Sequence, residues 1–202
     1  PWRVVRGRDP NWVKFYGQRE TAGGYFTSGC GTEIYQGRLF PREMVGQLFC
    51  CEPSNNVIHR SVLTLDGSAY RARRKASEAR SEFLASGDPW FRPVNLRVGP
   101  DGAMYIVDMY REIVEDYSAI PRFLQQRYGL SGGRKLGRIW RLIPEKARLR
   151  PAVDWQRASN EVLLAALADE NAWRRFTAQR VLIGRGGRTA VDGLAEMVRQ
   201  DR

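Results

Sequence analysis

The sequence predicts a mainly β region followed by an α-helical segment, and two observations support this fold class. Up to about residue 145, short runs of alternating apolar and polar residues are separated by Gly, Pro and Asp turns, which is typical of an antiparallel sandwich or propeller. After Pro151 the apolar residues recur at helical spacing instead. Strands and helices do not alternate along the chain, so a Rossmann-type fold is not favoured.

Two strands open the β region. "GQLFCCEP" and "NNVIHRSVLTLDG" read as strands joined by a turn at residues 53–56, and Asp66–Gly67 signals the turn that follows. The next stretch, residues 68–88, is polar and basic. We expect it to be a surface excursion rather than part of a sheet.

A hairpin is predicted in "DPWFRPVNLRVGPDGAMYIVDMYR", residues 88–111. Val94, Leu96 and Val98 alternate with polar residues, and "GPDG" supplies the turn. "AMYIVDMY" forms the returning strand, and residues 111–118 are expected to form a third. "LGRIWRLIP", residues 136–144, is a further short alternating strand.

Three helical stripes follow Pro151, centred on residues 162–167, 173–182 and 191–198. Ser159 or Asn160 and then Asn171 are suitable N-caps, and Gly184 is a suitable C-cap. A short helix, a tight turn, a longer helix and a Gly-rich link are typical of a HEAT-type solenoid. Such a solenoid needs about three repeats to be stable, and this chain has about one and a half.

Composition limits the function classes. The chain has 202 residues, of which 43% are hydrophobic and 27% charged, as expected for a globular protein with a core. No run of about 18 apolar residues and no opening signal peptide is present. Because Pro1 is followed almost at once by strand-like sequence, we expect the chain to be an internal fragment.

The cysteines, Cys30, Cys50 and Cys51, are too few and too irregular for a disulfide framework. The sequence has no CxxC and no CxxCH, so it encodes neither a zinc ribbon nor a covalent haem site. The three residues are expected to be small buried hydrophobes.

The net charge of +11 raises the possibility of an anionic partner. Residues 122–150 contain one acid, Glu145, and nine basic side chains: Arg122, Arg127, Arg134, Lys135, Arg138, Arg141, Lys146, Arg148 and Arg150. A basic stripe of this kind is a weak signal for nucleic acid, and we do not favour nucleic-acid binding.

Several motifs together resemble a known family. In chain order they are "FTSGCGTEIYQG", "LFCCEPSNNVIHR", "SEFLASGDPWFRPVNLRVGPDGAMYIVDMYR", "IP" at 120–121 and "LGRIWRL". They resemble the last blades of the β-propeller in large bacterial membrane-bound dehydrogenases, which are similar to glucose/sorbosone dehydrogenases. The helical stretch "LLAALADENAWRRFTAQRVL" resembles the first of the HEAT-like repeats that follow that propeller. The resemblance covers about residues 23–184.

The resemblance implies a fold and an activity. Residues 1–145 would be the C-terminal part of a β-propeller, 146–158 a linker, and 159–202 the start of a HEAT-like solenoid. The parent would be a periplasmic or membrane-associated quinoprotein that oxidises a sugar or alcohol and passes electrons to a cytochrome c domain absent from this chain. We expect the fragment to be inactive by itself. Pyrroloquinoline quinone and calcium are the cofactors that the resemblance implies.

Four residues are candidates for such a site. Arg92 and Arg111 could bind the carboxylates of the quinone, because a guanidinium binds carboxylates in a bidentate manner; Arg92 could instead pair with Asp88. Asp108 could be a general base, a calcium ligand or the partner of Arg111. His59, the only histidine, could take the hydroxyl proton or be structural. Asp101 and Gly102 are expected to be a turn, with a calcium role as the alternative.

Two further interpretations remain open. In one, the protein is a non-enzymatic module that binds polysaccharide or a protein partner in the propeller channel and on the concave face of the solenoid, and it would show exposed aromatic platforms. In the other, residues 122–150 bind a polyanion, which would make binding steeply dependent on salt. Converging Arg, His and Asp side chains would favour the enzyme over the module.

Overall fold

The computed structural model describes residues 26, 28–111, 114, 122–127, 132–186 and 190–200. These residues divide into two compact units. The first contains residues 28–34, 47–97 and 105–140 within the described ranges, and the second contains residues 35–46, 98–104 and 141–200. The predicted strand at 111–118 and the "IP" at 120–121 lie largely outside the described residues.

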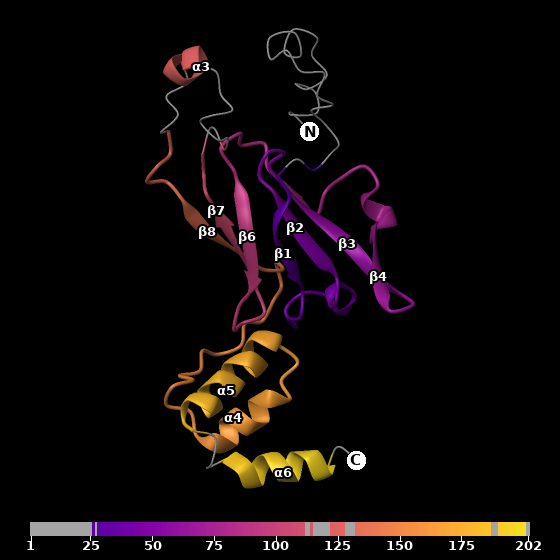
Figure 1. Ribbon diagram of the computed structural model, residues 1–202, viewed down its shortest axis with the longest axis vertical. Helices are drawn as coiled ribbons and strands as arrows, with labels where there is room; N and C mark the ends of the chain where they lie inside the picture. Colours follow the sequence, from indigo (N-terminus) through magenta and orange to yellow (C-terminus); the bar gives the residue numbers. More distant parts are fainter. Residues whose placement is uncertain are drawn as a thin grey trace. The chain divides into compact units, whose positions relative to one another are not determined.

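The first sheet is an antiparallel meander of four strands with a short fifth strand (Figure 1). It runs β1 (Cys30–Ile34), β2 (Leu48–Glu52), β3 (Val57–Asp66) and β4 (Ala69–Arg74), and β5 (Leu84–Ala85) pairs with the start of β3. The turn at 53–56 sets the register of β2 against β3, in which Cys50 lies opposite His59. Asn56 closes this turn with a φ of 57°, a backbone conformation that Asn tolerates better than most residues.

The second sheet has three strands in the order β6 (Pro93–Val98), β7 (Met104–Asp108) and β8 (Arg138–Leu142). The predicted "GPDG" turn joins β6 to β7. Gly102 has a φ of 84°, and the Gly102 N–H donates to the Gly99 carbonyl at 3.0 Å. A short helix, α3 (Arg122–Arg127), lies between β7 and β8 in the sequence.

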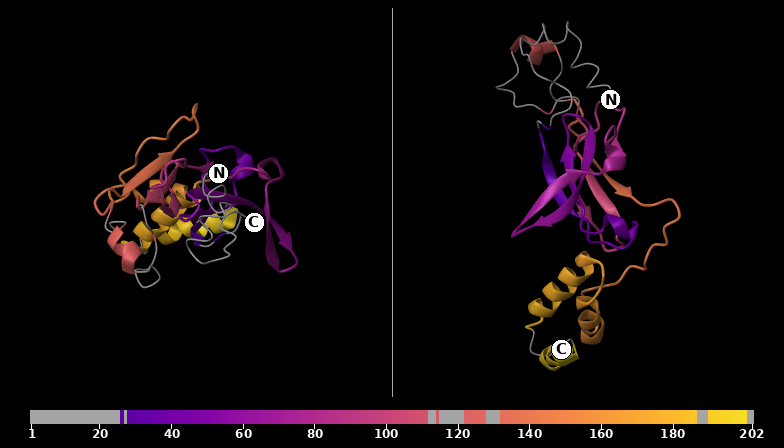
Figure 2. Two further views of the ribbon diagram at one scale, coloured as in Figure 1. Left: turned by 90° about the horizontal axis from the view of Figure 1, so that it is seen from above. Right: turned by 90° about the vertical axis from the view of Figure 1, so that its right-hand side faces the viewer.

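The propeller predicted from the sequence is wrong for the described residues. Their strands form two open sheets, which end at β1 and β4 and at β6 and β8, and no closed ring of blades forms (Figure 2). Alternation and turn residues determine which neighbouring strands pair, but they carry no information about closure, which depends on contacts between sheets. Residues 68–88 also differ from prediction, because β4 and β5 lie within them and pair with β3.

Three C-terminal helices follow: α4 (Asn160–Leu167), α5 (Ala172–Gly184) and α6 (Val191–Gln200). Ser159 caps α4 by accepting a hydrogen bond from the Val162 N–H, and Asn171 caps α5 by accepting one from the Trp173 N–H. The buried side chains between the helices are Leu163, Ala166, Ala178, Leu182 and Ala190. The predicted helices are therefore present, although the fold class as a whole was wrong.

Candidate functional site

The carboxylate of Asp108 organises the end of the second sheet. It lies at the last position of β7 and is 1% exposed. Oδ1 accepts hydrogen bonds from the main-chain N–H groups of Arg92, at 2.8 Å, and Tyr110, at 2.9 Å. Oδ2 accepts from the indole Nε1 of Trp140 at 3.0 Å and lies 3.5 Å from the Arg138 Nε. One buried side chain therefore fixes three separate segments of the chain.

Four side chains form what we call the aromatic–arginine cluster: Trp90, Tyr110, Arg138 and Trp140. The Arg138 guanidinium carbon lies 3.4 Å from the centre of the Tyr110 ring and 5.3 Å from that of Trp140. The Trp90 and Tyr110 rings are 5.6 Å apart at an interplanar angle of 52°. These are stacking and cation–π distances. Trp140 is 47% exposed and the other three are half-buried, so the cluster is open to solvent.

The backbone beside the cluster has one strained residue, Tyr110, and one position that only glycine suits, Gly133. Tyr110 has a φ of 49°, which is uncommon for a residue with a bulky side chain. Gly133 has a φ of 84°, and a Cβ at this position would lie 2.4 Å from the Tyr110 carbonyl oxygen and 3.4 Å from the Trp90 ring. Strain of this kind persists where the surroundings hold it in place, and it occurs often at binding sites.

The predicted cofactor residue Arg92 has its guanidinium directed at main-chain carbonyls. It is 3% exposed, and it donates from Nε to the Arg111 carbonyl at 2.8 Å and from Nη1 to the Pro53 carbonyl at 2.9 Å. Asp88, the alternative partner expected from the sequence, accepts a hydrogen bond from the Trp90 N–H at 2.9 Å. These contacts give Arg92 the role of joining the β2–β3 turn to the segment after β7.

His59 lies on β3 in a different polar group. Its Nδ1 is 2.7 Å from the Glu82 Oε2, and its Nε2 is 3.1 Å from the Ser61 Oγ. The histidine and the serine are two residues apart on one strand, so both side chains point to the same face of the sheet. Of the predicted site residues, the structure brings Arg92 together with Asp108 and with the main-chain carbonyl of Arg111, and it gives His59 its own neighbours.

Sequence reasoning missed six residues of the aromatic–arginine cluster and the His59 group: Trp90, Tyr110, Arg138, Trp140, Ser61 and Glu82. The pattern "HRS" contained a signal, because residues two apart on a strand share a face. Trp140 and Glu82 gave no such signal, since their partners lie 32 and 23 residues away in the sequence.

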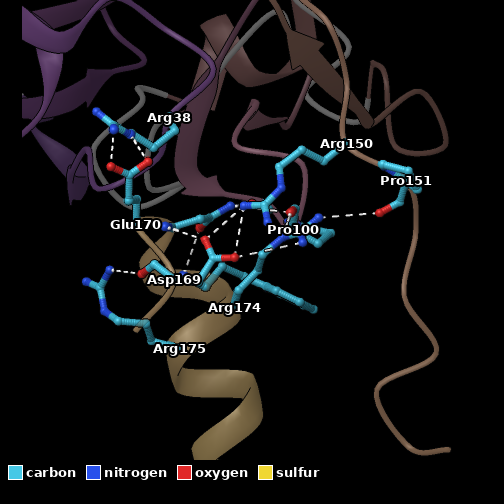
Figure 3. A network of polar contacts seen from close by, with 11 residues as sticks. Arg38, Pro100, Arg150, Pro151, Asp169, Glu170, Arg174 and Arg175 are labelled. Carbon is cyan, nitrogen blue, oxygen red and sulfur yellow. Dashed lines mark hydrogen bonds and ion pairs between the residues drawn. The ribbon is translucent and has the colours of Figure 1, made fainter. Parts of the chain in front are cut away.

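A second polar network lies in the second compact unit, which contains the C-terminal helices (Figure 3). Asp169 pairs with Arg150 at 2.9 Å and lies 3.9 Å from Arg174. Arg174 also donates to the Pro100 carbonyl at 2.8 Å, and burial is the largest cause that lowers its pKa. Arg38 and Glu170 form an ion pair beside this network. The charged side chains of this network pair with one another, so we assign the network a structural role.

Asp101, a possible calcium ligand by sequence, belongs to the turn before β7. Its Oδ1 accepts from the Ala103 N–H at 3.0 Å, and its other oxygen pairs with Arg141. Within the described ranges, no three His, Cys, Asp or Glu side chains are close enough together to hold a metal ion. None of the helices in those ranges has the length and apolar character needed to cross a bilayer.

The chain matches one family model, described as a domain of unknown function, DUF7133, over residues 4–146. The match covers well over half of the 202 residues, so the chain belongs to this family. No curated protein and no solved structure matches the chain.

Proposed function

We propose that this DUF7133 protein is a binding module for polysaccharide, with the aromatic–arginine cluster as its binding surface. The observation that carries the proposal is the exposed Trp140 ring beside the Arg138 guanidinium, with both held by the buried Asp108. Aromatic rings held rigidly at a surface lose little entropy on binding, and Trp, Tyr and Arg are the residues that most often dominate binding energy. A sugar ring offers an apolar C–H face to stack on the aromatic ring and hydroxyl groups to hydrogen-bond at its rim.

An acidic polysaccharide fits this surface better than a neutral one. Arg134, Lys135 and Arg138 follow one another closely before and within β8, and residues 122–144 contain no acid. A guanidinium binds a carboxylate through two parallel hydrogen bonds, and positive potential increases the rate at which an anionic chain associates. The whole chain has a net charge of +11, which supports the same partner.

The test is a binding titration of the full chain with polygalacturonate. Binding is measured by tryptophan fluorescence and by calorimetry. We expect Trp140→Ala to weaken binding by at least about tenfold, as expected for a central aromatic anchor. The matched control is Ile139→Ala, which removes a neighbouring side chain that is 67% exposed on the same strand and should leave affinity unchanged.

Two further ligands separate the possible partners. Neutral dextran should bind more weakly than polygalacturonate. Double-stranded DNA tests the polyanion interpretation, which predicts binding that falls steeply with salt and is insensitive to Trp140→Ala. If the folded chain binds no polysaccharide, or if Trp140→Ala and Ile139→Ala bind equally well, the proposal is wrong.

The sugar or alcohol oxidoreductase implied by the resemblance is the second candidate, and the His59–Glu82 pair favours it. With its proton on Nδ1, facing the Glu82 carboxylate, the imidazole carries on Nε2 the lone pair that a general base uses, and a substrate hydroxyl would have to take the place of the Ser61 hydroxyl beside it. The expected quinone site does not fit the described residues, because Arg92 and Asp108 direct their polar atoms at the protein itself.

The second candidate has its own experiment. The protein is titrated with pyrroloquinoline quinone, with and without Ca²⁺, while reduction of a dye by aldoses is followed. Turnover that is lost in His59→Gln would support the oxidoreductase, and the absence of both binding and turnover in the folded protein would remove it. The periplasmic location and the cytochrome partner remain predictions from the resemblance.

A further inference from the structure

The polar group around His59 has the arrangement of a nucleophile, a base and an acid. The Ser61 hydroxyl lies 3.1 Å from the His59 Nε2, and the Glu82 carboxylate lies 2.7 Å from the His59 Nδ1. These distances place a serine within hydrogen-bond reach of a base that a third group orients, which is the arrangement required for covalent catalysis. We propose that Ser61, His59 and Glu82 form a catalytic site that hydrolyses small carboxylic esters.

The acid of this group is held in place from its other side. The Glu82 Oε1 accepts a hydrogen bond from the Arg74 Nη2 at 2.7 Å. The Arg74 Nη1 in turn donates to the carbonyls of Ser81, at 2.8 Å, and Glu78, at 3.3 Å. Arg74 thus fixes the carboxylate, which leaves the Glu82 Oε2 directed at His59. With the proton of the imidazole on Nδ1, the Nε2 lone pair faces the serine hydroxyl.

Ser61 is the nucleophile of the site, although a thiol lies close by. Cys50 is directly opposite His59 in the β2–β3 register. However, its Sγ is directed at the main-chain carbonyls of Cys30, at 3.7 Å, and Cys51, at 3.5 Å. Burial raises the pKa of the Cys50 thiol, which keeps it in the unreactive protonated form. The hydroxyl of Ser61 is the group that contacts the base.

The nucleophile and the base of the proposed site are both largely buried. His59 is 9% exposed and Ser61 is 8% exposed. The Phe26 ring lies 5.0 Å from the His59 ring, centroid to centroid, and is itself 49% exposed. Because the side chains of His59 and Ser61 are almost fully covered, a short acyl group such as acetyl fits this proposal better than a long acyl chain. The proposed substrate class is therefore the acetyl ester of an alcohol.

The reaction balances with water as the only co-reactant. The Ser61 Oγ attacks the ester carbonyl, while its proton passes to the His59 Nε2. The tetrahedral intermediate collapses to an acetyl ester on Ser61, and the leaving alcohol takes the proton from Nε2. Water then attacks the acyl group, gives one proton to Nε2, and releases acetic acid as Ser61 recovers its proton.

The first experiment needs no variant. The full chain is treated with a fluorophosphonate probe, and the modified residue is identified by mass spectrometry. We expect an adduct on Ser61 and none on Ser68, an exposed serine in the neighbouring turn. If the folded chain carries no adduct on Ser61, the proposal is wrong, because an activated serine reacts with this probe.

The second experiment measures hydrolysis of p-nitrophenyl acetate. Ser61→Ala, His59→Gln and Glu82→Gln should each lower kcat/KM by about 100-fold or more, the usual contribution of positioned acid–base groups. Ser68→Ala is the matched control and should leave the rate unchanged. Hydrolysis that survives Ser61→Ala but not His59→Gln would indicate attack by the imidazole itself and would overturn the serine mechanism.

The proposal is independent of polysaccharide binding, since the two sites share no residue. The esterase proposal can also be distinguished from the oxidoreductase candidate, because dye reduction would require His59 but not Ser61. Ser61→Ala should therefore abolish ester hydrolysis and leave any aldose oxidation intact.

Discussion

Replacing Asp108 tests the organisation of the binding surface directly. Its carboxylate accepts one fully buried hydrogen bond, from the Arg92 N–H, and two partly buried ones, from the Tyr110 N–H and the Trp140 indole. Asp108→Ala leaves all three donors without this acceptor. A buried donor left unsatisfied costs about 1–3 kcal/mol. Taking roughly 2 kcal/mol for the buried bond and about 1 for each of the others gives a loss of about 4 kcal/mol.

Asp108→Asn should cost less, because the amide oxygen can still accept from the two main-chain N–H groups. Its NH₂ group would face the Trp140 indole N–H and the Arg138 guanidinium, so the contacts at Oδ2 are lost. We expect a loss of about 1–2 kcal/mol. Polysaccharide affinity should fall with it, because Trp140 is no longer held.

The measurement is equilibrium unfolding in urea, monitored by far-ultraviolet circular dichroism. Asp66→Ala is the matched control, because it removes an exposed carboxylate paired with Arg71 on the other sheet. An exposed pair contributes about 0–1 kcal/mol. If Asp108→Ala lowers the free energy of unfolding by no more than Asp66→Ala does, the organising role of the Asp108 carboxylate is refuted.

Three further predictions follow from single residues. Gly133→Ala should destabilise the protein by about 1–3 kcal/mol more than Gly67→Ala, because both have positive φ but only the former places a Cβ against a carbonyl, that of Tyr110; equal losses in thermal unfolding would contradict this. Asn171→Ala should lower the free energy of unfolding by about 2 kcal/mol in the same assay, because it removes the cap of α5 and a buried hydrogen bond to the Gly99 carbonyl at 2.9 Å. A loss below about 0.5 kcal/mol would rule out this stabilising role of Asn171. Burial raises the pKa of Cys51 to about 12, so the reactive thiolate is scarce below that pH; iodoacetamide at pH 8 should modify this residue at least about 100-fold more slowly in the folded chain than in urea, and similar rates would refute the shift.

The sequence by itself determined the local elements whose signals lie within a few residues. The turn at 53–56, the "GPDG" turn and the caps at Ser159 and Asn171 depend on the backbone preferences and hydrogen-bonding groups of neighbouring residues. Among the strands beside those turns, β7 alternates because one of its faces is buried. These features were predicted correctly for that reason.

Strand β4 could not be predicted from the residue pattern of its own segment. All six of its residues are exposed, so its side chains have no apolar alternation to read. It is a strand because its main chain pairs with β3 from Ser61↔Arg74 to Asp66↔Ala69. Sheet closure was mispredicted for a related reason, since it depends on contacts between sheets that residue patterns do not encode.

The contacts that define both candidate sites depend on the tertiary structure. Asp108 and His59 could be selected from the sequence as polar residues on strands, but their roles follow from partners distant in the chain. Trp140 reaches Asp108 across 32 residues, and Glu82 reaches His59 across 23. A side chain's chemistry is determined by the groups that surround it, and only the folded chain brings those groups within hydrogen-bond distance.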